Sequence, residues 1–91
     1  KVIVDLTADW CVECRIMDKN LFHNRPAQMQ DWQLVRLDIT ETTDDSKAIL
    51  ARYKLFGPPA LLYYQDGQLT NQQVGEIGRS EFEQTLTALN Q

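Results

Sequence analysis

The first eight residues, Lys1-Val-Ile-Val-Asp-Leu-Thr-Ala8, constrain the fold more than any other part of the sequence. This run is β-branched and apolar on both alternating faces, a pattern typical of a central strand that is covered on both sides. From Cys11 the period becomes helical, with one inward stripe formed by Cys14, Met17, Asp18, Leu21 and Phe22. A buried strand that passes directly into an amphipathic helix predicts an α/β domain.

The middle of the chain continues the alternation of helix and strand. Pro26 suits the first turn of a short segment that runs to Trp32, and Leu34–Ile39 alternates as a strand. The next helix is expected to end before Gly57-Pro58-Pro59. Its cap is Thr43, Asp44 or Asp45, and its inward side carries Ile49, Leu50 and Tyr53.

The last third predicts a hairpin and a final helix. Ala60–Tyr64 has the pattern of a buried strand, and Asp66-Gly67 is a strong turn signal that joins it to a strand through Val74 to Ile77. Ser80-Glu-Phe-Glu83 is a capping box that opens a helix with Phe82, Leu86 and Leu89 inward. The predicted order is therefore βαβαββα.

Length and charge limit the class of protein. The chain has 91 residues, 43% of them hydrophobic, which predicts a single domain over residues 1–91. A net charge of -4 argues against a nucleic-acid partner. The longest apolar runs fall far short of the roughly 20 residues that span a bilayer, so the residues given predict a soluble unit without direct membrane insertion. Because the chain begins at Lys1 inside a strand, we expect it to be a piece of a longer protein.

The candidate for chemistry is the pair Cys11 and Cys14, placed where the buried strand passes into a helix. A thiolate at Cys11 would be stabilised by the first turn of the helix, and Cys14 could then resolve a mixed disulfide. The alternatives are a structural disulfide, which would close too small a loop to stabilise the fold much, and a zinc half-site. Zinc is disfavoured because it normally takes four ligands, and the chain has only one histidine, His23, besides the two cysteines. His23 is expected on the surface, and no metal is predicted.

Two carboxyls lie on faces where apolar side chains are expected. Asp5 shares a strand face with Ile3 and Thr7, and burial there should raise its pKa; the alternative is a strand-end carboxylate that reaches water. Asp18 lies on the inward helical stripe; the alternative for it is a partly exposed helix residue.

The segment Val4 to Cys14 resembles the active-site segment of the thioredoxin superfamily. The resemblance extends over nearly the whole chain and implies a central mixed four-stranded sheet flanked by helices. It also implies a cis peptide bond from Pro58 to Pro59 and places Gly75 in the last strand. The chain departs from the full thioredoxin pattern by lacking its first strand and helix.

Within the superfamily, the chain is similar to the C-terminal periplasmic domains of the DsbD family of transmembrane thiol-disulfide interchange proteins. Val12 and Glu13 lie between the cysteines, Arg15 follows them, and Asp18 stands where these domains carry an acid. The resemblance implies a periplasmic protein-disulfide reductase, a domain of an inner-membrane protein associated with cytochrome c biogenesis. Its implied partners are protein disulfides and dithiols, especially the membrane and N-terminal domains of the same protein. A monomer is implied, with no cofactor other than its own disulfide.

The resemblance also implies roles for individual residues. Asp5 would lie beneath Cys14 and exchange a proton with it, with Asp18 as a second acid in the same pocket. A partner segment would bind around Pro58 and Pro59, although Pro59 also suits a simple strand start. The side chains of Trp10 and Phe56 are expected either at the rim of this groove or in the core.

Negative charge around the cysteines predicts a weakly activated dithiol. Asp5, Asp9, Glu13 and Asp18 are offset locally by Arg15, and each ionised carboxylate should raise the pKa of Cys11. The domain is therefore expected to act as a reductant that is activated on docking. Two other functions remain open: a free-standing thioredoxin-like reductase, and a peptide-binding module whose cysteines are inert.

Overall fold

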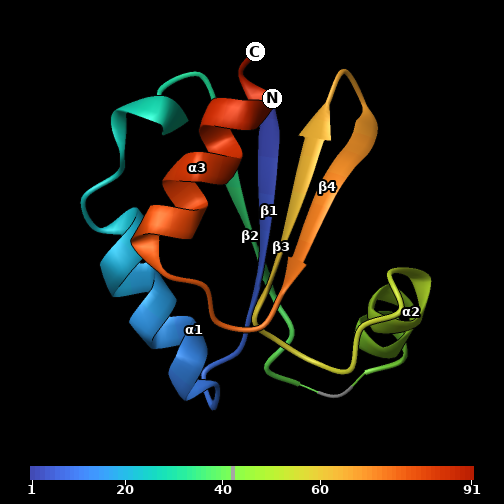
Figure 1. Cartoon of the computed structure of the whole chain (residues 1–91). Coiled ribbons are helices and arrows are strands. Elements are labelled where there is room, and N and C mark those ends of the chain that lie inside the picture. Colours follow the sequence, from blue (N-terminus) through green and yellow to red (C-terminus); the bar gives the residue numbers. More distant parts are fainter. Residues whose placement is uncertain (42) are drawn as a thin grey trace.

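A single four-stranded sheet forms the centre of the molecule in the computed structural model, which describes residues 1–41 and 43–91 (Figure 1). The strands are β1 (Val2–Thr7), β2 (Gln33–Asp38), β3 (Ala60–Gln65) and β4 (Gln68–Val74). Their order is β2-β1-β3-β4, with β1 parallel to β2 and antiparallel to β3. The mixed sheet and the central position of the first strand are confirmed.

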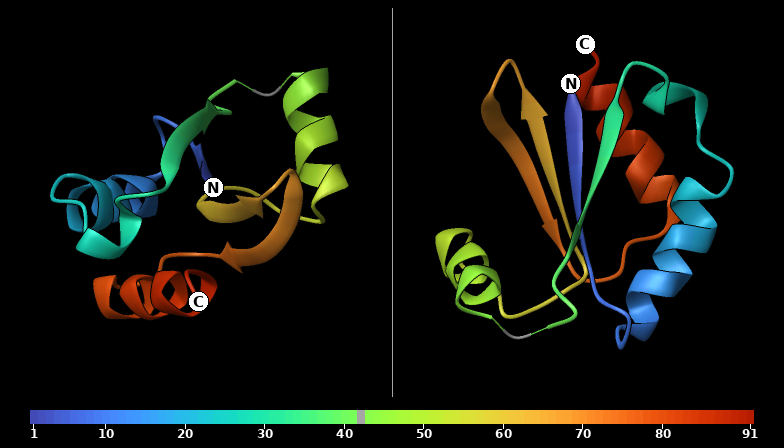
Figure 2. Two further views of the ribbon diagram at one scale, coloured as in Figure 1. Left: turned by 90° about the horizontal axis from the view of Figure 1, so that it is seen from above. Right: turned by 180° about the vertical axis from the view of Figure 1, so that it is seen from behind.

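Helices lie on both faces of this sheet. Figure 2 shows α1 (Val12–Met17) and α3 (Arg79–Leu89) together on one side and α2 (Asp44–Arg52) on the other. The two termini lie at one end of the sheet, and the β1–α1 junction lies at the opposite end (Figure 1). The predicted order βαβαββα is confirmed.

Two apolar clusters hold the helices to the sheet. On one face, Ile3 and Tyr63 pack with Met17, Leu21, Phe82 and Leu86 from the helical layer. On the other, Leu6 and Leu62 pack with Ile39, Leu55 and the two cysteines, while Ile49, Leu50 and Tyr53 from α2 add partly buried side chains. The inward stripes predicted for α2 and α3 are confirmed. The stripe predicted from Cys14 is confirmed for Met17, Leu21 and Phe22, whereas Cys14 belongs to the second cluster and Asp18 to neither.

Local sequence signals explain the hairpin and one helix start. Asp66 and Gly67 both adopt positive φ, 55° and 81°, as a two-residue hairpin turn between twisted strands requires. Thr43 caps α2: its hydroxyl accepts a hydrogen bond from the backbone N–H of Ser46, whose own hydroxyl accepts one from the Thr43 N–H. Both features were predicted from the sequence, with Thr43 as one of three candidate caps.

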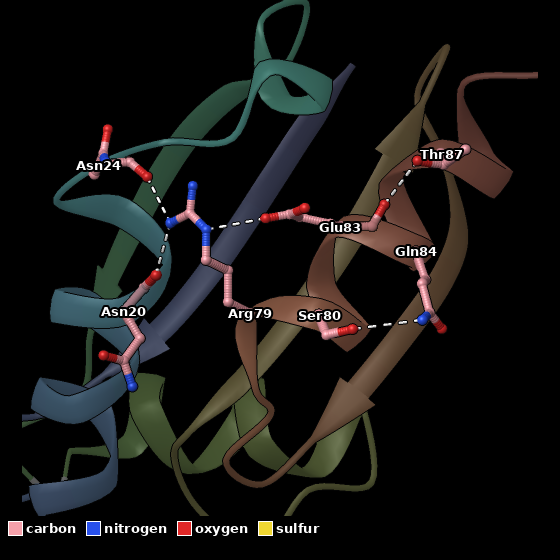
Figure 3. A network of polar contacts seen from close by, with 7 residues as sticks. All are labelled: Asn20, Asn24, Arg79, Ser80, Glu83, Gln84 and Thr87. Carbon is pink, nitrogen blue, oxygen red and sulfur yellow. Dashed lines mark hydrogen bonds and ion pairs between the residues drawn. The ribbon is translucent and has the colours of Figure 1, made fainter.

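The capping box predicted at Ser80 is wrong. The helix begins two residues earlier, with Gly78 in place of Ser80 at the cap position, Arg79 as its first residue and no side-chain cap. Figure 3 shows why: the Arg79 guanidinium donates to the backbone carbonyls of Asn20 and Asn24, and its Nε pairs with Glu83. Glu83 is therefore bound by Arg79 and does not reach back to Ser80.

Three predicted boundaries also shift. β4 ends at Val74, and Gly75 leaves the strand with φ +89°, so Gly75 and Ile77 lie outside it. The helix from the cysteines changes at Met17 into a π-helical segment, Asp18–Phe22. Pro26 caps a 3₁₀ turn, Ala27–Met29, and does not occupy its first position.

Candidate active site

A disulfide joins Cys11 and Cys14 at the junction of β1 and α1, with their Cα atoms 5.3 Å apart. Cys11 is the N-cap residue of α1, and its Sγ accepts a hydrogen bond from the Cys14 backbone N–H at 3.2 Å. A second bond, from the Cys11 N–H to the Ala8 carbonyl at 3.1 Å, closes the turn that precedes it. The backbone therefore supplies Cys11 Sγ with a donor that stabilises negative charge on sulfur.

Both cysteines are nearly buried in this oxidised state, Cys11 being 3% exposed and Cys14 5%. They pack against Leu6, Ala60 and Leu62 at the end of the sheet. The Sγ of Cys14 lies 3.9 Å from the Leu6 carbonyl oxygen, on the inner side of the pair. An incoming protein must therefore contact the side chains around the disulfide before it reaches a sulfur atom.

Asp5 is a buried carboxyl on the central strand. The residue is 6% exposed, and burial raises its pKa from 3.8 to about 7; the cation of Arg36 opposes this rise and the charge of Asp18 adds to it. The predicted direction of the shift is confirmed, and the alternative of a carboxylate reaching water is wrong. The carboxyl can therefore exist in both protonation states near neutral pH.

Asp18 lies half-buried at the first position of the π-helical segment and forms an ion pair with Arg36. Arg36 is a residue of the site that the sequence pattern did not indicate. Arg36 is exposed on β2, where it is the register partner of Asp5, and residues paired across strands share a face of the sheet. Only the strand register shows this, since 31 positions along the chain separate the two residues.

Exposed apolar side chains form a shallow hollow that includes Trp10, the residue before Cys11. Trp10 is 60% exposed and Phe56 is fully exposed, so both lie at the rim and the core alternative is wrong. They line a shallow hollow together with Pro58 and Pro59, Val74 and Gly75 also contributing. The peptide bond between Pro58 and Pro59 is cis, as the family resemblance implied.

The charged side chains next to Cys11 in the sequence are mostly acidic. Glu13 Oε2 lies 4.0 Å from Cys11 Sγ, and Asp9 is exposed beside Trp10. The guanidinium of Arg15 donates to the Asp9 backbone carbonyl. His23 is exposed, as expected. Negative charge thus lies close to the sulfur of Cys11, whereas the cationic group of Arg15 is bound to the backbone.

A family model described as thioredoxin matches residues 1–88. The chain belongs to the thioredoxin family. Among curated proteins it is similar to the thiol:disulfide interchange protein DsbD of Pseudomonas fluorescens, with 38% identity over 94% of this chain and 16% of that protein. It is also similar to a thioredoxin of Mycoplasmoides gallisepticum, with 29% identity over 94% of this chain and 81% of that protein.

Solved structures agree with these relatives. The reduced C-terminal domain of DsbD from Neisseria meningitidis superposes with a TM-score of 0.79 at 27% identity, covering 96% of this chain and 78% of that one. The thioredoxin-like fold and the resemblance to the C-terminal domain of DsbD are confirmed. The chain spans only 16% of the length of the Pseudomonas fluorescens DsbD. Within the described residues, no helix is both long and apolar enough to cross a bilayer.

Proposed function

We propose that this chain is a thiol-disulfide oxidoreductase domain that relays electrons from a membrane-embedded cysteine pair to a periplasmic disulfide partner. In this proposal it is the soluble, periplasmic domain of an inner-membrane protein of the DsbD type. The observation that carries the proposal is the Cys11–Cys14 disulfide at a strand-to-helix junction, whose strand also carries Asp5, a buried carboxyl with a pKa of about 7. The similarity to DsbD over 94% of the chain supports the relay.

The proposed reaction transfers two electrons in two exchange steps. In the reduced domain, the Cys11 thiolate attacks one sulfur of the partner disulfide, forms a mixed disulfide and releases the other partner sulfur as a thiolate. Cys14 then loses its proton and attacks Cys11 Sγ, which breaks the mixed disulfide and releases the second partner sulfur as a thiolate that takes up a proton. The partner gains two electrons, and the domain returns to the disulfide form. A donor dithiol reduces the domain again by the same steps in reverse.

Asp5 is the proposed acceptor of the Cys14 proton. Its pKa of about 7 suits a group that must take up and return a proton near neutral pH. Asp5 precedes Leu6, whose carbonyl oxygen lies 3.9 Å from Cys14 Sγ, which supports assigning the carboxyl to this cysteine. Asp18 adds negative charge that raises the pKa of Asp5, and Arg36 limits the rise.

The charges next to Cys11 support a dithiol that reacts slowly until a partner docks. The Cys14 N–H favours a thiolate on Cys11, whereas the Glu13 carboxylate at 4.0 Å disfavours it. The 3% exposure of Cys11 further limits attack on small solvated reagents. Docking of a partner on Trp10, Phe56, Pro58 and Pro59 would exclude water and bring its disulfide to Cys11.

A trapping experiment tests the exchange reaction. Cys14→Ser removes the resolving thiol, so the reduced variant should accumulate a mixed disulfide through Cys11 when mixed with insulin, detected by mass spectrometry without reductant. Cys11→Ser is the matched control and should form no such adduct. If Cys14→Ser stays unmodified, the cysteines are inert and the peptide-binding module becomes the better account.

A free-standing reductase is the second candidate, favoured by the similarity to a thioredoxin that the chain covers to 81%. The two candidates differ in what is encoded upstream of Lys1. The relay requires apolar spans of roughly 20 residues there, each long enough to cross a bilayer. Sequencing the complete gene decides between them, and an upstream region without such spans would exclude the relay.

A further inference from the structure

The turn that carries Trp10 into Cys11 is held by a residue far away in the sequence. Thr40, just past the end of β2, binds this turn at two points. Its hydroxyl oxygen accepts a hydrogen bond from the Asp9 backbone N–H at 2.9 Å, and its backbone carbonyl accepts one from Trp10 Nε1 at 2.9 Å. Thr40 thus fixes both the backbone before Cys11 and the outer end of the Trp10 ring.

Asp38 in turn holds Thr40. Its carboxylate oxygen Oδ1 accepts the Thr40 backbone N–H at 2.8 Å and also accepts the Thr40 hydroxyl. Because a hydroxyl has a single proton, donation to Asp38 leaves the oxygen lone pairs free to accept from Asp9. The carboxylate therefore sets the direction of the bond that reaches the active-site turn.

The Asp9 peptide is also held from its other side, since the Arg15 guanidinium donates to its carbonyl. Both backbone polar groups of Asp9 are therefore bound, one through β2 and one through α1. Trp10, which follows directly, is 60% exposed and lines the hollow beside Phe56, Pro58 and Pro59. A large side chain in water would otherwise sample several rotamers, and ordering it on docking would cost binding free energy.

We propose that Asp38 and Thr40 form a positioning pair that keeps Trp10 and the turn before Cys11 in the conformation that receives a partner protein. Neither residue touches the reacting sulfur atoms. The pair lowers the cost of docking and leaves the chemical step unchanged, so it should act on the concentration of protein substrate needed for half-saturation. This inference rests on the proposed exchange of disulfides with protein partners.

The test compares Thr40→Val with Thr40→Ser. Valine keeps the β-branched shape and loses the hydroxyl, whereas serine restores it. In stopped-flow reactions of the reduced domain with insulin, Thr40→Val should raise the half-saturating concentration by about two- to tenfold, the range for one lost hydrogen bond, and keep the limiting rate. Thr40→Ser should restore wild-type behaviour. Thr70→Val is the matched control, because the Thr70 hydroxyl on β4 also forms a hydrogen bond with the backbone, donating to the Tyr63 carbonyl and not to the turn before Cys11.

Hydrogen exchange supplies a readout that a general loss of stability would not reproduce. In Thr40→Val, the Asp9 amide should exchange faster by about the same factor, while the Trp32 indole N–H, bound to Asn90, should keep its protection. Asp38→Ala removes the acceptor of both Thr40 bonds at an exposed position, so it is the second variant if Thr40→Val fails to fold, and it should shift the same two measurements in the same direction.

The outcomes separate this inference from the proposed function. If wild-type protein exchanges with insulin and neither Thr40→Val nor Asp38→Ala changes half-saturation or Asp9 exchange, the positioning pair is refuted and the exchange reaction stands. A fall in the limiting rate with unchanged half-saturation also refutes it. If wild-type protein reacts with neither insulin nor glutathione disulfide, the proposed function itself fails, and the positioning role fails with it.

Discussion

Replacement of the Asp5 carboxyl by an amide tests the electrostatics of the site most directly. Burial raises the pKa of Asp5 from 3.8 to about 7. Each unit of difference between folded and unfolded states corresponds to about 1.4 kcal/mol, so the ionised carboxylate should lower the free energy of unfolding by about 4 kcal/mol relative to its protonated form. Asp5→Asn cannot ionise and should escape this cost. The 6% exposure of the residue leaves little solvent to screen the charge.

The pH window follows from the two pKa values. Below the unfolded value of 3.8 the carboxyl is protonated in both states and costs nothing. Between 3.8 and about 7 the unfolded chain has lost the proton and the folded protein keeps it, so stability falls as pH rises. Above about 7 both states are ionised and the full cost is present. The advantage of Asp5→Asn should therefore grow with pH and then level off.

Urea unfolding of the oxidised proteins at several pH values from about 4 to about 9 measures this difference, with an extrapolation error of about 10–15%. Asp31→Asn is the matched control, because it removes the same charge from an exposed turn before β2. Its stability relative to wild type should vary little with pH. A difference between Asp5→Asn and wild type that is the same at every pH would refute the assignment of a raised pKa to Asp5.

Two further measurements test the charges around the site. Arg36→Gln should raise the pKa of Asp5 further and Asp18→Asn should lower it, because Arg36 lowers that pKa and Asp18 raises it. The pKa of Asp5 in each variant can be measured by NMR from the pH dependence of its carboxyl carbon chemical shift. Equal pKa values in the two variants would contradict these opposite effects of Arg36 and Asp18. In reduced Cys14→Ser, alkylation of Cys11 should be slow at neutral pH and faster in the Glu13→Gln background, because the carboxylate 4.0 Å from the sulfur is neutralised. Fast alkylation of Cys11 at neutral pH, with or without Glu13→Gln, would refute the proposal that the dithiol is unreactive until a partner docks.

Features with a local cause could be predicted from the sequence. The central strand followed from its apolar pattern on both faces, and the hairpin from Asp66-Gly67, where both residues adopt positive φ. The raised pKa of Asp5 followed from a carboxyl placed on an apolar strand face. Each of these signals lies within a few residues, so no knowledge of the tertiary contacts was needed.

Features fixed by distant contacts could not be predicted in this way. Ser80 has the spacing of a capping residue. The helix nevertheless begins at Arg79, whose side chain binds backbone carbonyls 59 and 55 positions away. The contacts of Thr40 with Asp9 and Trp10 span 31 and 30 positions. Every residue has a backbone carbonyl whatever its side chain, so a pattern of residue types cannot indicate which carbonyls a distant side chain will bind.

The register between β1 and β2 links these distant contacts to one another. Asp5 pairs with Arg36, and Thr7 pairs with Asp38. A shift of β2 by one residue would bring Val35 or Leu37 opposite Asp5, because side chains alternate between faces. Asp5 would then lose the cation that lowers its pKa.

The same shift would move Thr40 along the strand direction, away from the Asp9 N–H and the Trp10 indole that it now binds. The pKa of Asp5 and the conformation of the turn before Cys11 therefore both depend on the register between the parallel strands β1 and β2. That pairing is in turn enforced by the apolar partners Val4 with Val35 and Leu6 with Leu37, which share the opposite face of the sheet. Apolar packing on the face that also carries the cysteines thus determines which side chain lies opposite Asp5.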